Sequence, residues 1–233
     1  MKVELIKQLV FEAAHSNPKG GPAQQRLHGH SYEVDILASG TPDPNVGWIV
    51  DFATLKQIFA PLYETLDHAH LNNIAGLADD TTVPAITRWL DARISPKPNW
   101  LDGVRVRILG DLAFAPVRLP ADHYADLPDR IRFTFEAAQS LPALPGDHPC
   151  KKVHGHSYRI EVAANDLSAL EPHLAELYNY FDHQYLNGLQ GLDQATVEVI
   201  SGHIWDWLTA RGLTPSAVVV QETPSSRCIY RGA

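Results

Sequence analysis

Hydrophobic and polar residues alternate in two separate stretches of this chain, and the same five residues, HGHSY, open both. Alternation with a period of two is typical of a β-strand that buries one face. The buried face would carry His28, His30, Tyr32, Val34 and Ile36 in the first stretch, and His154, His156, Tyr158, Ile160 and Val162 in the second. We therefore expect two half-buried strands whose first inward side chains are histidines.

Helical periodicity follows each stretch. Apolar residues recur every three or four positions through residues 52–66 and 167–181, which predicts one amphipathic helix in each half of the chain. A second helix is expected to begin after Thr82 in the first half and after Thr196 in the second, since threonine is a good N-cap residue. Each half therefore has the predicted order β-β-α-α-β, with a final short strand as an extension.

The two halves also match block by block. The matching pairs are LVFEAAHS (9–16) with FTFEAAQS (133–140), YETLDHAHLN (63–72) with YNYFDHQYLN (178–187), and GVRVRIL (103–109) with SAVVVQE (216–222). Internal similarity in a constant order indicates a tandem duplication. We place copy 1 at residues 1–118 and copy 2 at 130–233, with a linker at 119–129. The linker lies in a proline-containing segment, 110–130, that lacks periodicity.

Composition and charge narrow the classes of function. The chain has 233 residues, 45% of them hydrophobic, which is enough for one large core or two smaller ones. Its formal net charge of −8 argues against binding to nucleic acid or to an anionic membrane. We find no apolar run near the roughly 20 residues of a membrane span, and no secretory signal pattern. We expect a cytoplasmic protein whose two cysteines stay reduced.

Twelve histidines are many for this length, and the repeated blocks hold most of them. His28 and His30 would project from one strand face, and His15 would join them if the strand before pairs with theirs as a hairpin. Three imidazoles with an open fourth position are typical of a catalytic zinc site. In copy 2, Gln139 stands where copy 1 has His15, so His154 and His156 would bind zinc more weakly. For any single histidine, an ordinary packing role is the alternative.

A thiol and a carboxylate are candidates for chemistry in copy 2 only. Cys150 precedes His154 by four residues and is followed by Lys151 and Lys152, whose charges would lower its pKa and favour a base or a nucleophile. An inert buried cysteine is the alternative. Glu222 ends the apolar run AVVVQE, where burying a carboxylate requires a partner such as ring N–H donors.

An aspartate and a histidine end the first predicted helix in both copies. A carboxylate beside an imidazole can orient and charge it for proton transfer. Adjacent pairs of this kind also arise by chance, and a structural role is the alternative. Because Asp67 and His68 recur as Asp182 and His183 at the equivalent place, we keep both pairs as catalytic candidates.

Together, FEAAH, C-x3-HGHSY, LDH-x2-LN and the ending QET-x4-CIYRG resemble the 6-pyruvoyl-tetrahydropterin synthase and 6-carboxy-tetrahydropterin synthase family. The resemblance covers nearly the whole chain twice, and it is strongest to the bacterial carboxy-tetrahydropterin synthases of queuosine biosynthesis. It implies a tunnelling fold, in which ββααββ units with antiparallel sheets assemble into an oligomeric barrel with helices outside. A trimer or a dimer of two-copy chains would satisfy this.

The resemblance also implies a role for each candidate. His15, His28 and His30 would bind zinc, Cys150 would be the general base, and Glu222 would anchor the pterin. The Asp-His pairs, Asp67 with His68 and Asp182 with His183, would transfer protons at a site of a neighbouring unit. The implied reaction converts 7,8-dihydroneopterin triphosphate to 6-carboxy-tetrahydropterin, with loss of acetaldehyde and triphosphate.

Neither copy has the complete set of residues that the family carries in one unit. Copy 1 has the histidine triad without the thiol and the glutamate, and copy 2 has the thiol and the glutamate without the third histidine. Three hypotheses follow: catalysis in copy 2 with weak metal binding, a zinc-bearing copy 1 that supports catalysis in copy 2, or a protein that binds pterin without turnover.

Overall fold

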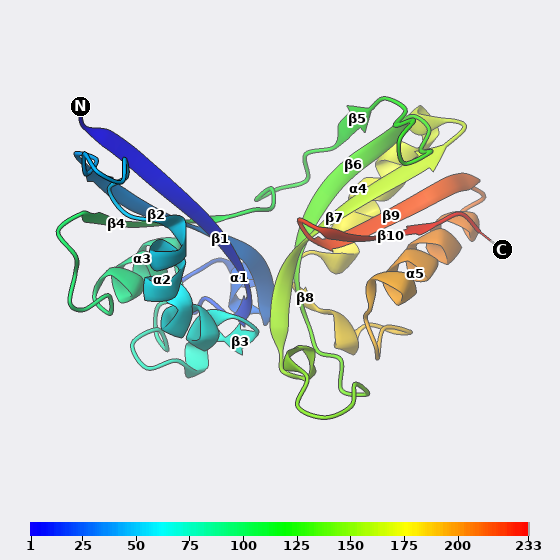
Figure 1. The fold of residues 1–233 in the computed structure, drawn as a ribbon. Helices are drawn as coiled ribbons and strands as arrows, with labels where there is room; N and C mark the ends of the chain where they lie inside the picture. Colours follow the sequence, from blue (N-terminus) through cyan, green and yellow to red (C-terminus); the bar gives the residue numbers. More distant parts are fainter. Residues whose placement is uncertain (233) are drawn as a thin grey trace.

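The computed structural model describes residues 1–232, which form two mainly antiparallel sheets with helices (Figure 1); only the short strands β3 and β8 pair in parallel among the described residues. The first half contains β1 (Val3–His15), α1 (Pro22–Gln25), β2 (His28–Gly40), α2 (Phe52–Leu66), β3 (Ala69–His70), α3 (Val83–Asp91) and β4 (Leu101–Ile108). The second contains β5 (Val117–Leu119), β6 (Arg130–Gln139), β7 (His154–Ala164), α4 (Leu167–Phe181), β8 (Gln184–Tyr185), α5 (Val197–Thr209), β9 (Pro215–Thr223) and β10 (Ser226–Tyr230). The predicted α+β class and the β-β-α-α-β order are confirmed in both halves.

The two sheets repeat one topology. The first has the order β3-β1-β2-β4, and in the second β6, β7 and β9 take the places of β1, β2 and β4. Two additions distinguish the second sheet: β10 forms a hairpin with β9, and β5 pairs with β6. The segment 110–130 is thus not wholly irregular, because three of its residues complete the second sheet.

The two equivalent 15-residue helices, α2 and α4, each begin at an aspartate. The side chain of Asp51 accepts hydrogen bonds from the amides of Ala53 and Thr54, and Asp166 does the same at the start of α4. Thr196 caps α5 through its hydroxyl, as predicted. Thr82 occupies the N-cap position of α3, but its hydroxyl does not cap the helix, because it donates to Asp80 Oδ1 at 2.6 Å instead.

Each half has its own apolar core between its sheet and its helices. The tyrosine of each HGHSY motif stacks on a phenylalanine of the preceding strand, with ring centroids 4.9 Å apart for both Phe11–Tyr32 and Phe135–Tyr158. All four rings are fully buried. The repeated motif therefore builds the same packing in both copies, besides placing its histidines.

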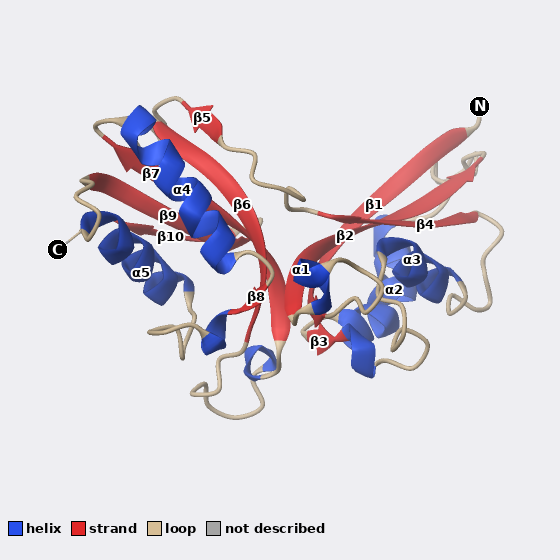
Figure 2. Cartoon of the chain, turned by 180° about the vertical axis from the view of Figure 1, so that it is seen from behind, coloured by secondary structure: helices blue, strands red, loops and turns tan. Residues whose placement is uncertain are grey.

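The halves meet where β2 crosses β7 and diverge from there in a V, with the termini at opposite sides (Figures 1 and 2). At the crossing, Gly29 and Gly155 lie so close that a Cβ on Gly29 would come within 2.3 Å of Gly155 Cα. The prediction of half-buried strands is therefore wrong at this end. Residues 28–32 are buried on both faces, one by their own core and the other by the second copy.

Two features concern the environment and assembly of the chain. Within residues 1–232, no helix combines the length and apolar character that a bilayer crossing requires. Neither sheet closes on itself in the described chain, and the outer edges of β4 and of most of β1 have no partner strand there. A closed barrel is thus not formed by one chain.

The glycine contact gives a prediction about stability. Gly29→Ala would place a Cβ against the backbone of both Gly155 and Ala13, so we expect a loss of about 1–3 kcal/mol or more in the free energy of unfolding. Gly202→Ala is the matched control, because a Cβ there meets no atom within 4 Å and lies in α5, where alanine gains roughly 0.5–1 kcal/mol over glycine. Urea unfolding curves of both variants would measure the difference; equal stabilities would contradict the close contact.

Candidate functional site

The hairpin of β1 and β2 brings three histidines of copy 1 together. His15 pairs directly with His28, and Ala13 pairs with His30, so the three side chains share one sheet face. Their ring centroids lie 4.4 to 5.0 Å apart, and all three side chains are buried. Each offers a ligand atom within 4.8 Å of the others.

Each of these rings is held through its Nδ1 atom. His15 donates to Thr81 Oγ1 at 2.8 Å, and His28 donates to the carbonyl oxygen of Arg26 at 2.8 Å. His30 donates to Glu136 Oε2 of copy 2 at 2.6 Å. The Nε2 atoms are left for a ligand, and that of His15 is buried with no partner among the described residues. The arrangement fits a zinc ion bound by three imidazoles.

The protonation of the triad supports metal binding. Burial, reinforced by the neighbouring imidazole of His30, lowers the pKa of His28 to about 3. Burial also lowers the pKa of His30 to about 3, and that of His15 falls well below its ordinary value for the same reason. All three are neutral at physiological pH, which is the state that binds a metal.

The Asp-His pair of copy 2 lies at this triad. The His183 ring is 4.3 Å from that of His28, centroid to centroid, and its Nδ1 donates to Asp182 Oδ2 at 2.6 Å. Arg26 holds the pair in place by donating to the carbonyl oxygen of His183 at 3.0 Å. The backbone of His183 has a positive φ of 54°, an uncommon conformation for this residue type that turns the side chain out from the end of α4.

Copy 1 has neither a thiol nor a carboxylate at the positions that correspond to Cys150 and Glu222 of copy 2. A pocket of about 250 Å³ beside the triad is lined by residues that include Gln24 and Ile108. Gln24 stands at the position of Cys150 in the aligned repeats. Ile108 pairs with Tyr32, and the pairing of Arg159 with Gln221 puts Glu222 at the corresponding place of β9, whereas the matched sequence blocks set Leu109 there. Copy 1 therefore offers metal ligands without a thiol or a carboxylate anchor.

The corresponding histidines of copy 2 lie in a different electrostatic environment. Burial lowers the pKa of His154 to about 3. Burial also opposes protonation of His156, but its hydrogen bond to Glu12 and the charge of Glu222 raise its pKa above the ordinary value. His156 Nδ1 donates to Glu12 Oε2 at 3.0 Å, and its Nε2 is 4.0 Å from Glu222 Oε2. A protonated His156 is a poor metal ligand.

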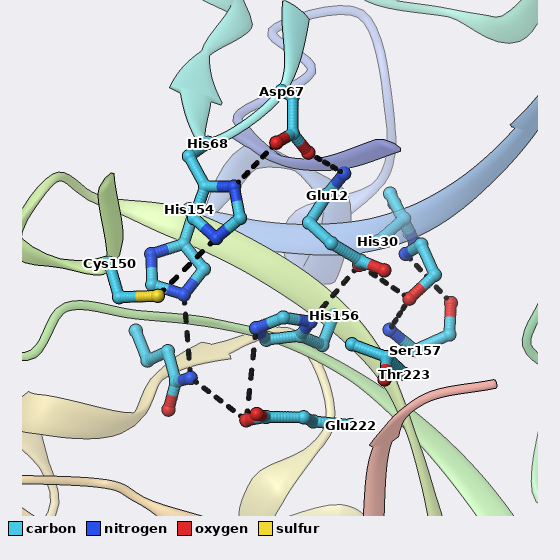
Figure 3. Close-up of polar contacts among 12 residues, drawn as sticks. Glu12, His30, Asp67, His68, Cys150, His154, His156, Ser157, Glu222 and Thr223 are labelled. Carbon is cyan, nitrogen blue, oxygen red and sulfur yellow. Dashed lines mark hydrogen bonds and ion pairs between the residues drawn. The ribbon is translucent and has the colours of Figure 1, made fainter. Parts of the chain in front are cut away.

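Cys150 of copy 2 meets the Asp-His pair of copy 1 (Figure 3). Its Sγ lies 3.4 Å from His68 Nε2, while His68 Nδ1 donates to Asp67 Oδ2 at 2.9 Å. Burial works against ionisation of Asp67, but hydrogen bonds from His68 and from the Glu12 amide hold its pKa below the usual value. The thiol, the imidazole and the carboxylate thus form a chain suited to proton transfer.

The expectation of a lowered pKa at Cys150 is wrong. Burial raises the pKa of this thiol, and the carboxylates of Glu222 and Asp67 add to the effect. Neither Lys151 nor Lys152 acts on this pKa, and the Lys151 ammonium group instead donates to the carbonyl oxygen of Gly146 at 3.0 Å. A base is therefore needed to take the thiol proton, and His68 is the imidazole in position to do so. Both cysteines are free, as predicted.

Glu222 lies at a pocket formed between the copies. This pocket has a volume of about 220 Å³ and is lined by Ser31, Glu33 and Leu109 of copy 1 and by Thr134, Ser157, Arg159, Gln221, Glu222, Thr223 and Pro224 of copy 2. The Glu222 carboxylate has a single weak partner of its own copy besides His156, the Gln139 amide at 3.5 Å. It remains able to accept hydrogen bonds from a ligand.

A second group with metal-ligand geometry consists of His68, Cys150 and His154. Their ligand atoms lie within 4.8 Å of one another, and the group draws on both copies. The sequence pattern predicts a weaker metal pair of His154 and His156 instead, because both side chains project from one face of the same strand. A metal bound here would coordinate the Cys150 sulfur, which could then no longer accept or donate a proton.

Sequence analysis missed two residues that join these sites, Glu12 and Glu136. Both lie in the repeated FEAA motif, and both are buried, with exposed fractions of 5% and 0%. Burial of a carboxylate in an apolar strand is the signal that had singled out Glu222, and the same signal applied to these two.

Comparison with known proteins follows the division into two copies. A family model described as 6-pyruvoyl tetrahydropterin synthase matches residues 4–109 and again 130–233. A 6-carboxy-5,6,7,8-tetrahydropterin synthase of Synechocystis is 35% identical over 95 residues, which are 39% of this chain and 73% of that protein. A dihydroneopterin monophosphate aldolase of Pyrococcus furiosus is 31% identical over 94 residues, 40% of this chain and 76% of that protein. The solved 6-pyruvoyl tetrahydropterin synthase of Caenorhabditis elegans aligns with 46% of this chain and 96% of its own, at 19% identity and a TM-score of 0.39.

Proposed function

Because this chain belongs to the 6-pyruvoyl tetrahydropterin synthase family, as a tandem duplicate, we propose that it is a pterin-pathway synthase whose reaction takes place in copy 2. The observation that carries the proposal is the 3.4 Å contact between Cys150 Sγ and His68 Nε2, which joins the thiol of copy 2 to the Asp-His pair of copy 1. The names of the relatives, a 6-carboxy-5,6,7,8-tetrahydropterin synthase and a dihydroneopterin monophosphate aldolase, support a pterin substrate. We propose 7,8-dihydroneopterin triphosphate, with 6-carboxy-tetrahydropterin as the product.

In the copy 2 site, some residues would bind the pterin and others would transfer protons. Glu222 would accept hydrogen bonds from the N–H groups of the pterin ring, which a carboxylate binds more strongly than a neutral oxygen does. His68, oriented by Asp67, would take the proton of Cys150, and the thiolate would then remove a proton from the substrate side chain. Asp182 and His183 form the equivalent acid-base pair beside the triad of copy 1, where Gln24 replaces the thiol.

We further propose zinc as the metal of the triad His15, His28 and His30 in copy 1, since its three neutral imidazoles and open pocket suit this ion. Zinc supplies Lewis-acid polarisation of an oxygen at its open position. Copy 1 (1–118) would then be the zinc-bearing unit and copy 2 (130–233) the thiol-bearing unit. This division favours the hypothesis in which the first copy supports the second.

A second candidate function is a pterin-binding protein without turnover. The observation that favours it is Gln139, which is buried in place of a third imidazole in copy 2 and contacts His154 Nε2 at 3.5 Å. Its amide nitrogen faces that ligand atom, and an amide binds zinc poorly. Binding of a pterin with no product, even with added zinc, would support this candidate over the enzyme.

We also propose a homo-oligomer in which neighbouring chains complete a barrel. The sheet face of copy 1 that carries the ion pairs Arg105–Asp35 and Arg107–Glu33 is polar, and the β4 edge lacks a partner in the described chain. Unpaired edges favour pairing with another chain. A trimer and a dimer of two-copy chains both satisfy this geometry.

The first test of these proposals concerns the metal. We expect one zinc ion per chain, lost in His28→Ala and retained in His156→Ala, because three neutral imidazoles converge only in copy 1 of the described chain. Metal analysis of the two purified variants would measure this. Zinc that survives His28→Ala but leaves with His156→Ala would overturn the assignment.

The second test concerns turnover. With 7,8-dihydroneopterin triphosphate as substrate, we expect Cys150→Ala to abolish product formation and to leave binding intact. Because the thiol pKa is raised, the thiolate fraction of the wild type grows as pH rises, so kcat/KM should increase from neutral towards alkaline pH.

Glu222→Gln is the control for that experiment, since it should weaken binding by about 1–3 kcal/mol through loss of a charged acceptor. Full turnover by Cys150→Ala would remove the thiol from the mechanism.

The third test concerns assembly. Light scattering at micromolar concentration should give a multiple of the 25.8 kDa chain mass. A monomer under these conditions would contradict the barrel.

A further inference from the structure

Glu136 belongs to copy 2 but holds a histidine of copy 1. Its Oε2 atom accepts hydrogen bonds from His30 Nδ1 at 2.6 Å and from Ser157 Oγ at 2.7 Å. The side chain has no exposed surface, so solvent does not weaken these bonds. One of the three candidate zinc ligands therefore depends on a carboxylate from the other copy.

The backbone of Glu136 anchors a second component of the same site. Its amide donates to Asp182 Oδ1 at 3.0 Å, and its carbonyl oxygen accepts from the amide of His183 at 2.6 Å. The ring of His183 lies against that of His28. Side chain and backbone of one residue thus position two parts of the copy 1 site.

Among the Nδ1 partners of the triad, Glu136 alone has an acidic group. His15 and His28 donate to a threonine hydroxyl and a backbone carbonyl oxygen, which are neutral. A carboxylate on Nδ1 fixes the tautomer that leaves Nε2 free and makes that nitrogen a stronger donor to a metal. The triad is therefore unequal, and His30 is the ligand that its surroundings strengthen most.

We propose that Glu136 is the positioning residue for the copy 1 metal, acting across the interface through His30. This inference rests on the zinc site of the proposed function. It adds that the affinity of that site is set by copy 2, so that the two copies form one metal-binding unit.

Glu12 supplies a matched control, because the interface is symmetric. Its Oε2 atom accepts from Ser31 Oγ at 2.6 Å and from His156 Nδ1 at 3.0 Å, the mirror image of the Glu136 contacts. Replacing Glu12 removes the same kind of interface contact but alters a histidine of copy 2. A purely structural role of these glutamates would make the two substitutions equivalent for the copy 1 metal.

The experiment measures zinc affinity of the full chain by competition with a chelator. Glu136→Gln keeps an oxygen that can accept from Ser157 but replaces the carboxyl group by a neutral amide, a weaker acceptor for His30 Nδ1, so we expect zinc to bind roughly 10- to 100-fold more weakly. Glu12→Gln should retain the wild-type affinity. The absorption spectrum of the Co²⁺-substituted protein should change in Glu136→Gln only, which reports on the ligand field independently of activity.

If Glu136→Gln does not fold, a second variant that disturbs Glu136 sterically can test the same inference. A Cβ on Gly110 would lie 1.6 Å from Glu136 Oε1, so Gly110→Ala should push the Glu136 side chain away from His30 while leaving its carboxyl group in the protein. We expect the same loss of affinity.

Unchanged zinc binding in the folded variants, or an equal loss in Glu136→Gln and Glu12→Gln, would overturn the inference. Absence of zinc from the wild type, or zinc that does not depend on His28, would instead refute the metal site of the proposed function.

Discussion

The close approach of the two copies at Gly29 and Gly155 is the constraint on which both sites depend. It brings the serines of the two HGHSY motifs within hydrogen-bonding distance, with Ser31 N to Ser157 Oγ at 3.1 Å and Ser157 N to Ser31 Oγ at 3.0 Å. Each serine hydroxyl donates to the FEAA glutamate of its own copy, and each glutamate accepts from a histidine of the other copy. A side chain larger than hydrogen at either glycine would part this network, because cores and tight interfaces tolerate added volume poorly.

Because of this network, each site draws residues from both copies. The triad of copy 1 receives Glu136 and His183, while the thiol site of copy 2 receives Glu12 and His68. In an assembly of identical single units, every site would change whenever one residue changed. When two copies lie in one chain, a residue can be lost from one site and kept in the other. This sequence shows such complementary losses, because copy 1 lacks the thiol and the glutamate and copy 2 lacks the third histidine.

The periodicity of the sequence predicted those parts of the fold that depend on residues close together in the chain. The strands, the amphipathic helices and the meeting of His15 with His28 and His30 all followed from spacing and one hairpin. The contact between Cys150 and His68 did not, because residues 82 positions apart meet only through the packing of two sheets. The prediction of a lowered pKa at Cys150 failed for a related reason, because burial and two carboxylates distant in sequence, Glu222 and Asp67, raise this pKa.

The difference between the two sites reduces largely to charge. In copy 1, Ile108 stands at the strand position of Glu222, and the buried histidines of the triad stay neutral, ready for a cation. In copy 2, Glu222 and Glu12 flank His156 and raise its pKa, so that this imidazole tends to carry the positive charge itself. Protonation of His156 would compete with metal binding, in a site that also lacks a third imidazole. The same carboxylates that disfavour metal binding there leave Glu222 as an acceptor for ring N–H groups. Glu222 at this strand position, together with Gln139 in place of a third imidazole, therefore gives the histidines of copy 2 a different electrostatic environment from those of copy 1.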